Sequence, residues 1–218
     1  MAETPNVLFI ICDQLRADHL GFAGNRVVRT PNIDSIATRG MVFENAWVAN
    51  PVCMPNRSTI MTGRMPTAHG VVFNDRSLDW GANTHVRSFR NAGYRTALIG
   101  KSHLQHGLSR NAVVPVDREP VSASPWPAGW DHLEDAELYD DGVPAWPDDF
   151  YGFDHVELSI DHGARVTGHH LHWALERGGR YEDLVVPMTD ASPAARRSER
   201  WWQIYEPPYG PELHSTTF

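Results

Sequence analysis

The stretch THVRSFRNAGYRTALIGKSHL, residues 84–104, places a helix and a strand next to each other. THVRSFRNAG predicts a helix that stops at Gly93, because glycine commonly follows the last helical turn. YRTALIG is an apolar run of strand length, which predicts a buried strand followed directly by Lys101. A helix that leads into a buried strand is the repeating unit of α/β proteins.

The segments before this stretch repeat the alternation. NVLFIICDQ is an apolar, β-branched run that stops abruptly at Asp13 and Gln14, as buried parallel strands with polar carboxyl ends do. NIDSIATRG predicts a short helix with Asn32 or Asp34 as its cap and a glycine stop. MVFENAW, residues 41–47, predicts a second strand, and RSTIMTG predicts another short helix.

The later segments predict one more strand and one more helix. YGFDHVELSI resumes strand-like alternation, and ARVTGHHLHWALERGG fits a helix that stops at Gly178. Residues 107–150, rich in Pro, Trp, Asp and Gly, predict a long irregular excursion over the surface, and such loops are usually functional. The fold class is therefore α/β, with a mainly parallel central sheet flanked by helices. Ligands bind at the carboxyl ends of such strands, where Asp13 and Lys101 lie.

Composition places the chain among ordinary globular proteins and disfavours two classes of function. Its 218 residues carry a formal net charge of −8, and the 19 Lys and Arg residues are scattered, so nucleic acid is not an expected partner. The longest wholly apolar run, VLFIIC, is far shorter than the roughly 20 residues of a membrane span. Because the N-terminus also lacks a basic signal segment, we expect a cytoplasmic protein with no membrane partner.

Two cysteines, Cys12 and Cys53, are too few for a disulfide framework. Cys12 lies in an apolar run and is expected to be a small buried hydrophobe. Cys53 lies in the polar stretch NPVCMPNRSTIMTGR, before Pro55 and Arg57 and at the start of a predicted helix. An electropositive helix start favours a thiolate, so on spacing alone Cys53 is either a reactive residue or an inert loop thiol.

Considered without the rest of the sequence, Asp13 and Lys101 each allow two interpretations. An aspartate after an apolar strand is either a hard oxygen ligand for a divalent cation or a turn or cap residue. A lysine that ends a buried strand either binds an anion or extends its ammonium group to solvent.

Four segments together point to a family. CMPNR and the following STIMTGR match the C-x-P-x-R core of the sulfatase signature and its continuation. NVLFIICDQLRADHLGFAGN, TPNIDSIATRGMVFENAW and GYRTALIGKSHL agree with that family in order and spacing. The chain resembles the formylglycine-dependent sulfatases and the related phosphonate monoester hydrolases of the alkaline phosphatase superfamily, strongly over residues 6–104 and more weakly around YGFDHVELSIDHGARVTGHHLHWAL.

The resemblance implies that Cys53 is a precursor, which a formylglycine-generating enzyme oxidises after translation. The hydrated aldehyde then carries two hydroxyl groups: one attacks the sulfur of a sulfate ester and displaces the alcohol, and the other re-forms the aldehyde to expel sulfate. The resemblance also implies a divalent cation, with Asp13, Gln14 and the residue at Cys53 as ligands. Ca²⁺ is the first expectation, and Mn²⁺ and Mg²⁺ are the alternatives.

Further roles follow from the same resemblance. Arg57 is expected to orient the diol, and Lys101 and His103 are expected to hold the sulfate oxygens and the second hydroxyl. Asn74 is expected to contact the substrate oxyanion. His162 is assigned as the general acid that protonates the leaving alkoxide.

The histidines of the later segments leave an alternative open. SIDHGARV also resembles a metal motif, which would make Asp161 and His162 ligands, but the preceding YGFDHVELS favours the acid. The cluster His169, His170 and His172 is expected to be a helix face rather than a second metal site.

Members of this family are typically more than twice as long, and their second pair of metal ligands and second catalytic lysine have no counterpart in this sequence. Residues 1–218 are therefore expected to be the N-terminal part of a single sulfatase-type catalytic domain whose C-terminal portion is missing. The alternative from a different class of function is a catalytically inactive fragment or an anion-binding protein. In the complete protein the expected substrate is a small-molecule sulfate ester, an aryl sulfate first, and a homo-oligomer is left open.

Two pairs of residues point to different branches of the family. The pair Asp13 and Gln14 favours the phosphonate monoester hydrolases, since many sulfatases have two aspartates there. Lys101 and His103 favour the sulfatases, because the phosphonate monoester hydrolases have uncharged hydroxyl side chains at those positions. Hydrolysis of sulfate monoesters is therefore the first expectation, and hydrolysis of phosphonate monoesters or phosphodiesters is the alternative.

Overall fold

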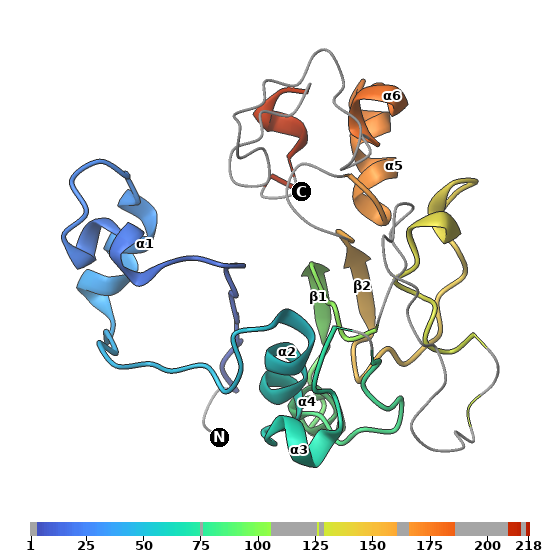
Figure 1. Cartoon of the computed structure of the whole chain (residues 1–218), viewed down its shortest axis with the longest axis horizontal. Helices are drawn as coiled ribbons and strands as arrows, with labels where there is room; N and C mark the ends of the chain where they lie inside the picture. Colours follow the sequence, from blue (N-terminus) through green and yellow to red (C-terminus); the bar gives the residue numbers. More distant parts are fainter. Residues whose placement is uncertain are drawn as a thin grey trace. The chain divides into compact units, whose positions relative to one another are not determined.

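The computed structural model describes residues 4–74, 76–105, 126, 129–160, 166–185, 209–214 and 217–218. The chain divides into two compact units, Met1–Trp47 and Val48–Phe218 (Figure 1). Within the described ranges, no helix has the length and apolarity that crossing a bilayer requires.

The first unit is built around helix α1 (Pro31–Arg39), which the 3-10 turns η1 (Ala17–His19) and η2 (Gly21–Ala23) precede. Proline suits the first helical position, because its missing N–H would have no partner there and its φ is already helical. The sequence thus predicted this helix correctly.

The start of α1 differs from the expected cap. The N-cap residue is Thr30, and neither Asn32 nor Asp34 occupies that position. Asp34 Oδ1 instead accepts hydrogen bonds from the backbone N–H of Phe22 and from the Thr30 hydroxyl, both at 2.9 Å. Asp34 therefore ties η2 to the first turn of α1.

Two strands predicted in this unit are absent from the structure. Residues 6–12 and 41–47 form no helix or strand, and their apolar side chains are exposed, up to 85% at Leu8 and 89% at Trp47. Cys12, which was expected to be buried, is exposed as well. An apolar run shows that a segment favours burial, but a strand also needs a neighbouring strand for its hydrogen bonds. The described residues of this unit offer no such neighbour.

The second unit contains a parallel pair of strands. β1 (Ala97–Gly100) and β2 (His155–Leu158) run side by side in the same direction (Figure 1), with Ala97 opposite His155 and Gly100 opposite Leu158. Parallel strands require a long crossover connection, which residues 101–154 supply. Both strands were predicted, and their pairing confirms the α/β fold class.

Three helices of this unit, those that begin at Cys53, His85 and His169, lie where the sequence patterns predicted helices. Among the described residues, the helical elements of the unit are α2 (Cys53–Thr62), α3 (Pro66–His69), α4 (His85–Asn91), η3 (Ala136–Tyr139), α5 (His169–Glu176), α6 (Tyr181–Leu184) and η4 (Pro211–Leu213). α2 begins four residues earlier than RSTIMTG suggested, so that Cys53 itself is helical.

Residues 129–150, part of the stretch that was expected to run over the surface, combine exposed side chains with several that are buried. Tyr139 and Phe150 are fully buried, and Glu134 is only 3% exposed. Trp146 meets Phe150 edge to face, with 4.9 Å between ring centroids. This stretch has no periodic pattern, so the sequence could not show which of its side chains point inward.

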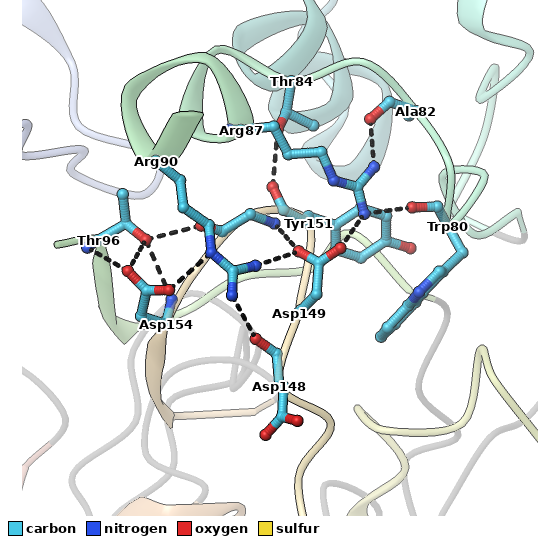
Figure 2. A network of polar contacts seen from close by, with 11 residues as sticks. Trp80, Ala82, Thr84, Arg87, Arg90, Thr96, Asp148, Asp149, Tyr151 and Asp154 are labelled. Atoms are coloured by element: carbon cyan, nitrogen blue, oxygen red, sulfur yellow. Dashed lines mark hydrogen bonds and ion pairs between the residues drawn. The ribbon is translucent and has the colours of Figure 1, made fainter. Parts of the chain in front are cut away.

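Charged side chains tie α4 to the residues that precede β2 (Figure 2). Arg87 Nη2 lies 2.9 Å from Asp149 Oδ2, and Arg90 Nη1 lies 3.3 Å from Asp149 Oδ1. Arg90 Nε also lies 2.8 Å from Asp154 Oδ1. These ion pairs connect residues that are about sixty positions apart in the sequence.

Thr96 fixes the register of the two strands at their common start. Its backbone N–H donates to Asp154 Oδ2 at 3.0 Å, and its hydroxyl donates to the Gly152 carbonyl at 2.7 Å. The Asp154 N–H donates in return to Thr96 Oγ1 at 3.0 Å. The Thr96 N–H lowers the pKa of Asp154, so the carboxylate stays ionised beside Arg90.

Candidate active site

Cys53 is the first residue of α2 and is partly exposed. The preceding N-cap residue, Val52, has no side-chain acceptor for the first N–H groups of the helix. Asn74 supplies one from a distant part of the chain, because its Oδ1 accepts a hydrogen bond from the Met54 N–H at 2.9 Å. Asn74, predicted as a substrate contact, thus holds the backbone immediately after Cys53.

Arg57 lies one helical turn after Cys53 and therefore on the same face of α2. Its Nη1 donates to the Lys101 carbonyl at 2.7 Å and lies 3.5 Å from the Ser102 carbonyl. The guanidinium group thereby joins the start of α2 to the turn that follows β1.

Lys101 follows β1 directly, and its Nζ lies 4.0 Å from Cys53 Sγ. The residue before it, Gly100, has a φ of +102°, a conformation that a side chain would strain. Glycine at this position lets the chain turn sharply at the carboxyl end of β1. An ammonium group this close to the Cys53 side chain favours negative charge on whatever is bound there.

His103 lies two residues further along the same turn and has a left-handed backbone, with φ at +54°. Its backbone N–H donates to Glu134 Oε2 at 2.7 Å. The structure therefore brings Cys53, Arg57, Asn74 and Lys101 together by direct contacts and places His103 on the turn that carries Lys101.

Glu134 is the site-supporting residue that sequence reasoning missed. Its buried carboxylate accepts hydrogen bonds from three consecutive backbone N–H groups, those of His103, Leu104 and Gln105. Burial raises the pKa of Glu134, and the three N–H groups act against that rise. Its segment, WDHLEDAELYDD, is rich in carboxylates, so nothing in the sequence separates Glu134 from solvated neighbours.

Asp13 and Gln14 are in the first unit, and Asp161 and His162 are outside the residues that the structure describes. Asp13 and Gln14 are both exposed, and Gln14 has a φ of +43°. Both readings of His162 therefore stay predictions.

Asp13 and Gln14 have the oxygen donors that a hard divalent cation prefers, but they do not make a complete metal site. Nowhere in the described ranges do three His, Cys, Asp or Glu side chains gather as they do around a metal ion. Calcium takes roughly six to eight oxygen ligands, so two adjacent residues supply only part of a coordination shell.

The histidines of α5 each have a separate backbone partner. The pairs are His169 Nδ1 with the Leu158 N–H at 3.1 Å, His170 Nε2 with the Leu213 carbonyl at 2.7 Å, and His172 Nε2 with the Tyr139 carbonyl at 2.8 Å. These contacts anchor α5 to three neighbouring segments, which agrees with their interpretation as helix-face residues.

Comparison with known proteins gives sulfatases as relatives. The chain is 44% identical over 101 residues to an arylsulfatase of Clostridium perfringens, 39% over 114 residues to an ulvan-active sulfatase of Formosa agariphila, and 35% over 131 residues to human steryl-sulfatase. These matches cover 46%, 52% and 55% of this chain and 21%, 22% and 22% of the relatives. The chain thus spans about a fifth of the length of these curated relatives.

Among solved structures, the phosphonate monoester hydrolase of Agrobacterium radiobacter resembles nearly all of the chain. The two are 25% identical with a TM-score of 0.64, over 98% of this chain and 36% of the hydrolase. The profile of the Sulfatase family matches residues 5–153, a region that contains Asp13, Cys53, Lys101 and Glu134. Because this match spans well over half of the chain, the protein belongs to the Sulfatase family.

Proposed function

We propose that the complete protein hydrolyses sulfate monoesters, aryl sulfates first, through a formylglycine made from Cys53. The observation that carries this proposal is the surroundings of Cys53, which begins α2 and lies 4.0 Å from Lys101 Nζ. A helix N-terminus and an ammonium group both attract negative charge. Such a site suits the anionic sulfate group of an ester.

The maturation of Cys53 is a covalent step with a defined balance. The bond between Cβ and sulfur breaks, a carbonyl forms on Cβ, and sulfur leaves as hydrogen sulfide. This change removes two electrons from the residue. Dioxygen is the oxidant: one of its atoms enters the carbonyl and the other leaves as water, with two further electrons from a thiol reductant. A formylglycine-generating enzyme would catalyse the step.

The described residues have separate tasks in the proposed reaction. Asn74 holds the first turn of α2 through the Met54 N–H, which keeps the residue at position 53 at the helix start. Lys101 offsets the negative charge that develops on the sulfate oxygens in the transition state. Arg57, through the Lys101 carbonyl, holds the turn that carries this lysine against α2.

The proton donor and the metal ligands have two further tasks. His162 is outside the described residues, and Asp13, Gln14 and the residue at Cys53 are only part of a metal site. His162 would donate the proton that the leaving alkoxide takes up. A divalent cation held by Asp13, Gln14 and the residue at Cys53, with further ligands from the complete protein, would polarise the sulfate group.

One observation favours a second candidate function, the hydrolysis of phosphonate monoesters. The phosphonate monoester hydrolase of Agrobacterium radiobacter aligns with 98% of this chain, whereas the sulfatases reported above align with about half of it. Sulfate monoesters and phosphonate monoesters both carry a single negative charge, so one cationic site suits both. Sulfate esters stay the first candidate because the relatives of higher identity are sulfatases.

Peptide mass tests the maturation step. Trypsin releases residues 40–57 as one peptide with Cys53 as its single cysteine. Conversion to formylglycine lowers the mass of this peptide by about 18 Da. The variant Cys53→Ala should lose turnover, and Cys12→Ala, the matched control, should keep it. An unmodified Cys53 thiol in an active preparation would refute the proposal that formylglycine is the nucleophile.

Substrate preference tests the choice between the two functions. The complete enzyme should be given an aryl sulfate and a phosphonate monoester with the same nitrophenol leaving group at one pH. We expect kcat/KM to favour the sulfate, with measurable turnover of the phosphonate. A tenfold preference for the phosphonate, about 1.4 kcal/mol of transition-state binding, would replace the first candidate with the second.

A further inference from the structure

The turn after Lys101 is closed by a carboxylate from a distant part of the chain. Glu134 Oε2 accepts from the His103 N–H at 2.7 Å, and Glu134 Oε1 accepts from the Leu104 and Gln105 N–H groups at 2.9 and 3.0 Å. Glu134 is 3% exposed, so water does not compete for these bonds. A single buried side chain thus satisfies three consecutive backbone donors.

The conformation of His103 explains why three N–H groups point at one place. Its φ of +54° is left-handed, and successive N–H groups around such a residue converge into a concave anion-binding site. Non-glycine residues seldom adopt this conformation, and the bonds to Glu134 hold His103 in it. Here the anion that fills the concavity is the protein's own carboxylate.

Gln105 fastens the same two segments a second time. Its Oε1 accepts from the Leu133 N–H at 2.9 Å, and its Nε2 donates to the Trp130 carbonyl at 3.0 Å. The side chain of Gln105 is fully buried. Residues 130–134 and the turn after β1 are therefore joined by bonds that run in both directions.

The position of this clamp matters because Lys101 lies just before it. On one side, Arg57 binds the Lys101 carbonyl from α2 at 2.7 Å. On the other, Glu134 holds the backbone from His103 onward. The turn is fixed at both ends, and Lys101 Nζ lies 4.0 Å from Cys53 Sγ.

We propose that Glu134 is a positioning residue of the hydrolase, which acts through the backbone of residues 103–105 to hold Lys101 and His103 at the Cys53 site. The proposal rests on the proposed function for its consequences on turnover. It assigns a role to the segment before β2 that is independent of substrate contact, since Glu134 bonds to backbone and not to a reacting group.

The variant Glu134→Gln in the complete protein tests this role. The amide keeps the size of the carboxylate but has one acceptor and one donor, so an NH₂ group would face a backbone N–H. We expect kcat for an aryl sulfate to fall by about tenfold or more, because misplaced catalytic groups slow the chemical step. KM should change by less than about threefold, because the charge that Lys101 offsets develops mainly in the transition state and not in the bound substrate. Glu137→Gln, an exposed carboxylate in η3, is the matched control and should behave as wild type.

Three measurements separate positioning from stability. The mass of peptide 40–57 gives the fraction converted to formylglycine, and the unfolding midpoint shows whether Glu134→Gln is folded at the assay temperature. Hydrogen exchange of the amides of residues 103–105 should be faster in this variant than in wild type. Wild-type kcat per formylglycine, or unchanged exchange at these amides, would overturn the proposal.

Two further outcomes have a defined consequence for the proposal. If Glu134→Gln does not fold, Glu134→Asp, which keeps the charge but shortens the side chain, takes its place: lowered kcat with KM retained supports the proposal, and wild-type kcat overturns it. If wild type itself turns over neither substrate, the proposed function fails. In that case exchange decides the clamp: acceleration confined to residues 103–105 supports it, and unchanged exchange refutes it.

Discussion

Replacing Arg87 with methionine should destabilise the second unit strongly. The Arg87 guanidinium donates to the carbonyls of Ala82 at 2.6 Å and Trp80 at 2.7 Å, and to Asp149 Oδ2 at 2.9 Å (Figure 2). Its side chain is 18% exposed, so most of these contacts are shielded from water. Methionine keeps the aliphatic stem and removes all three donors.

The expected cost lies between that of a surface pair and that of a buried pair. An exposed ion pair contributes about 0 to 1 kcal/mol, whereas breaking a buried one costs about 3 to 5 kcal/mol. The substitution removes the donor from two carbonyls and from one carboxylate oxygen. The Asp149 carboxylate, however, keeps its ion pair with Arg90 and its hydrogen bond from the Gly152 N–H. We therefore expect the free energy of unfolding to fall by about 3 kcal/mol.

Urea unfolding followed by tryptophan fluorescence measures this loss, since the Trp80 carbonyl is one of the bonded groups. With a slope of about 2 kcal/mol per molar urea, the midpoint should fall by about 1.5 M. Arg90→Met is the matched control: its side chain is 35% exposed, and about 1 kcal/mol is expected. If Arg87→Met costs no more than Arg90→Met, the argument from burial is wrong.

Three other changes have definite expectations. Asp13→Asn should weaken divalent-cation binding in a calorimetric titration, because one anionic oxygen donor becomes neutral; unchanged affinity would remove Asp13 from the ligands. Asn74→Ala should lower the free energy of unfolding by about 1 kcal/mol, since the Met54 N–H loses its capping acceptor, and a denaturant titration showing no loss would contradict this. Burial lowers the pKa of His170, whose Nε2 bonds the Leu213 carbonyl. The stability this imidazole contributes is therefore present above about pH 6.5 and lost as pH falls through the lowered pKa. Urea midpoints at several pH values should show this loss in wild type and a smaller one in His170→Gln.

Local patterns in the sequence determined most of the helices and both observed strands. The helices at Pro31–Arg39 and His85–Asn91 follow from short-range signals, namely apolar spacing and a glycine stop, which act within a few residues. The C-x-P-x-R motif at Cys53 is contiguous, so it indicates the family, and predicts Cys53 as the reactive residue, without any knowledge of the fold. Such features need no information from distant residues.

Contacts between distant residues were decided only by the tertiary structure. The runs at 6–12 and 41–47 have the composition of strands, but strand formation depends on a partner that a linear pattern cannot specify. Thr96 and Asp154 set the register of β1 and β2 across fifty-eight positions of sequence. Neither residue is distinguished by its neighbours.

The role of Glu134 at the candidate site likewise depends on contacts between distant residues, which the sequence pattern does not specify. Lys101 and His103 could be predicted because they belong to a short motif at the end of a strand. The carboxylate that holds the backbone of His103 and of the two residues after it comes from an acidic, irregular segment, in which each charged residue favours solvent when considered alone. Only the folded chain buries Glu134 against the N–H groups of residues 103–105, because the bonds made there replace those that the carboxylate gives up to water.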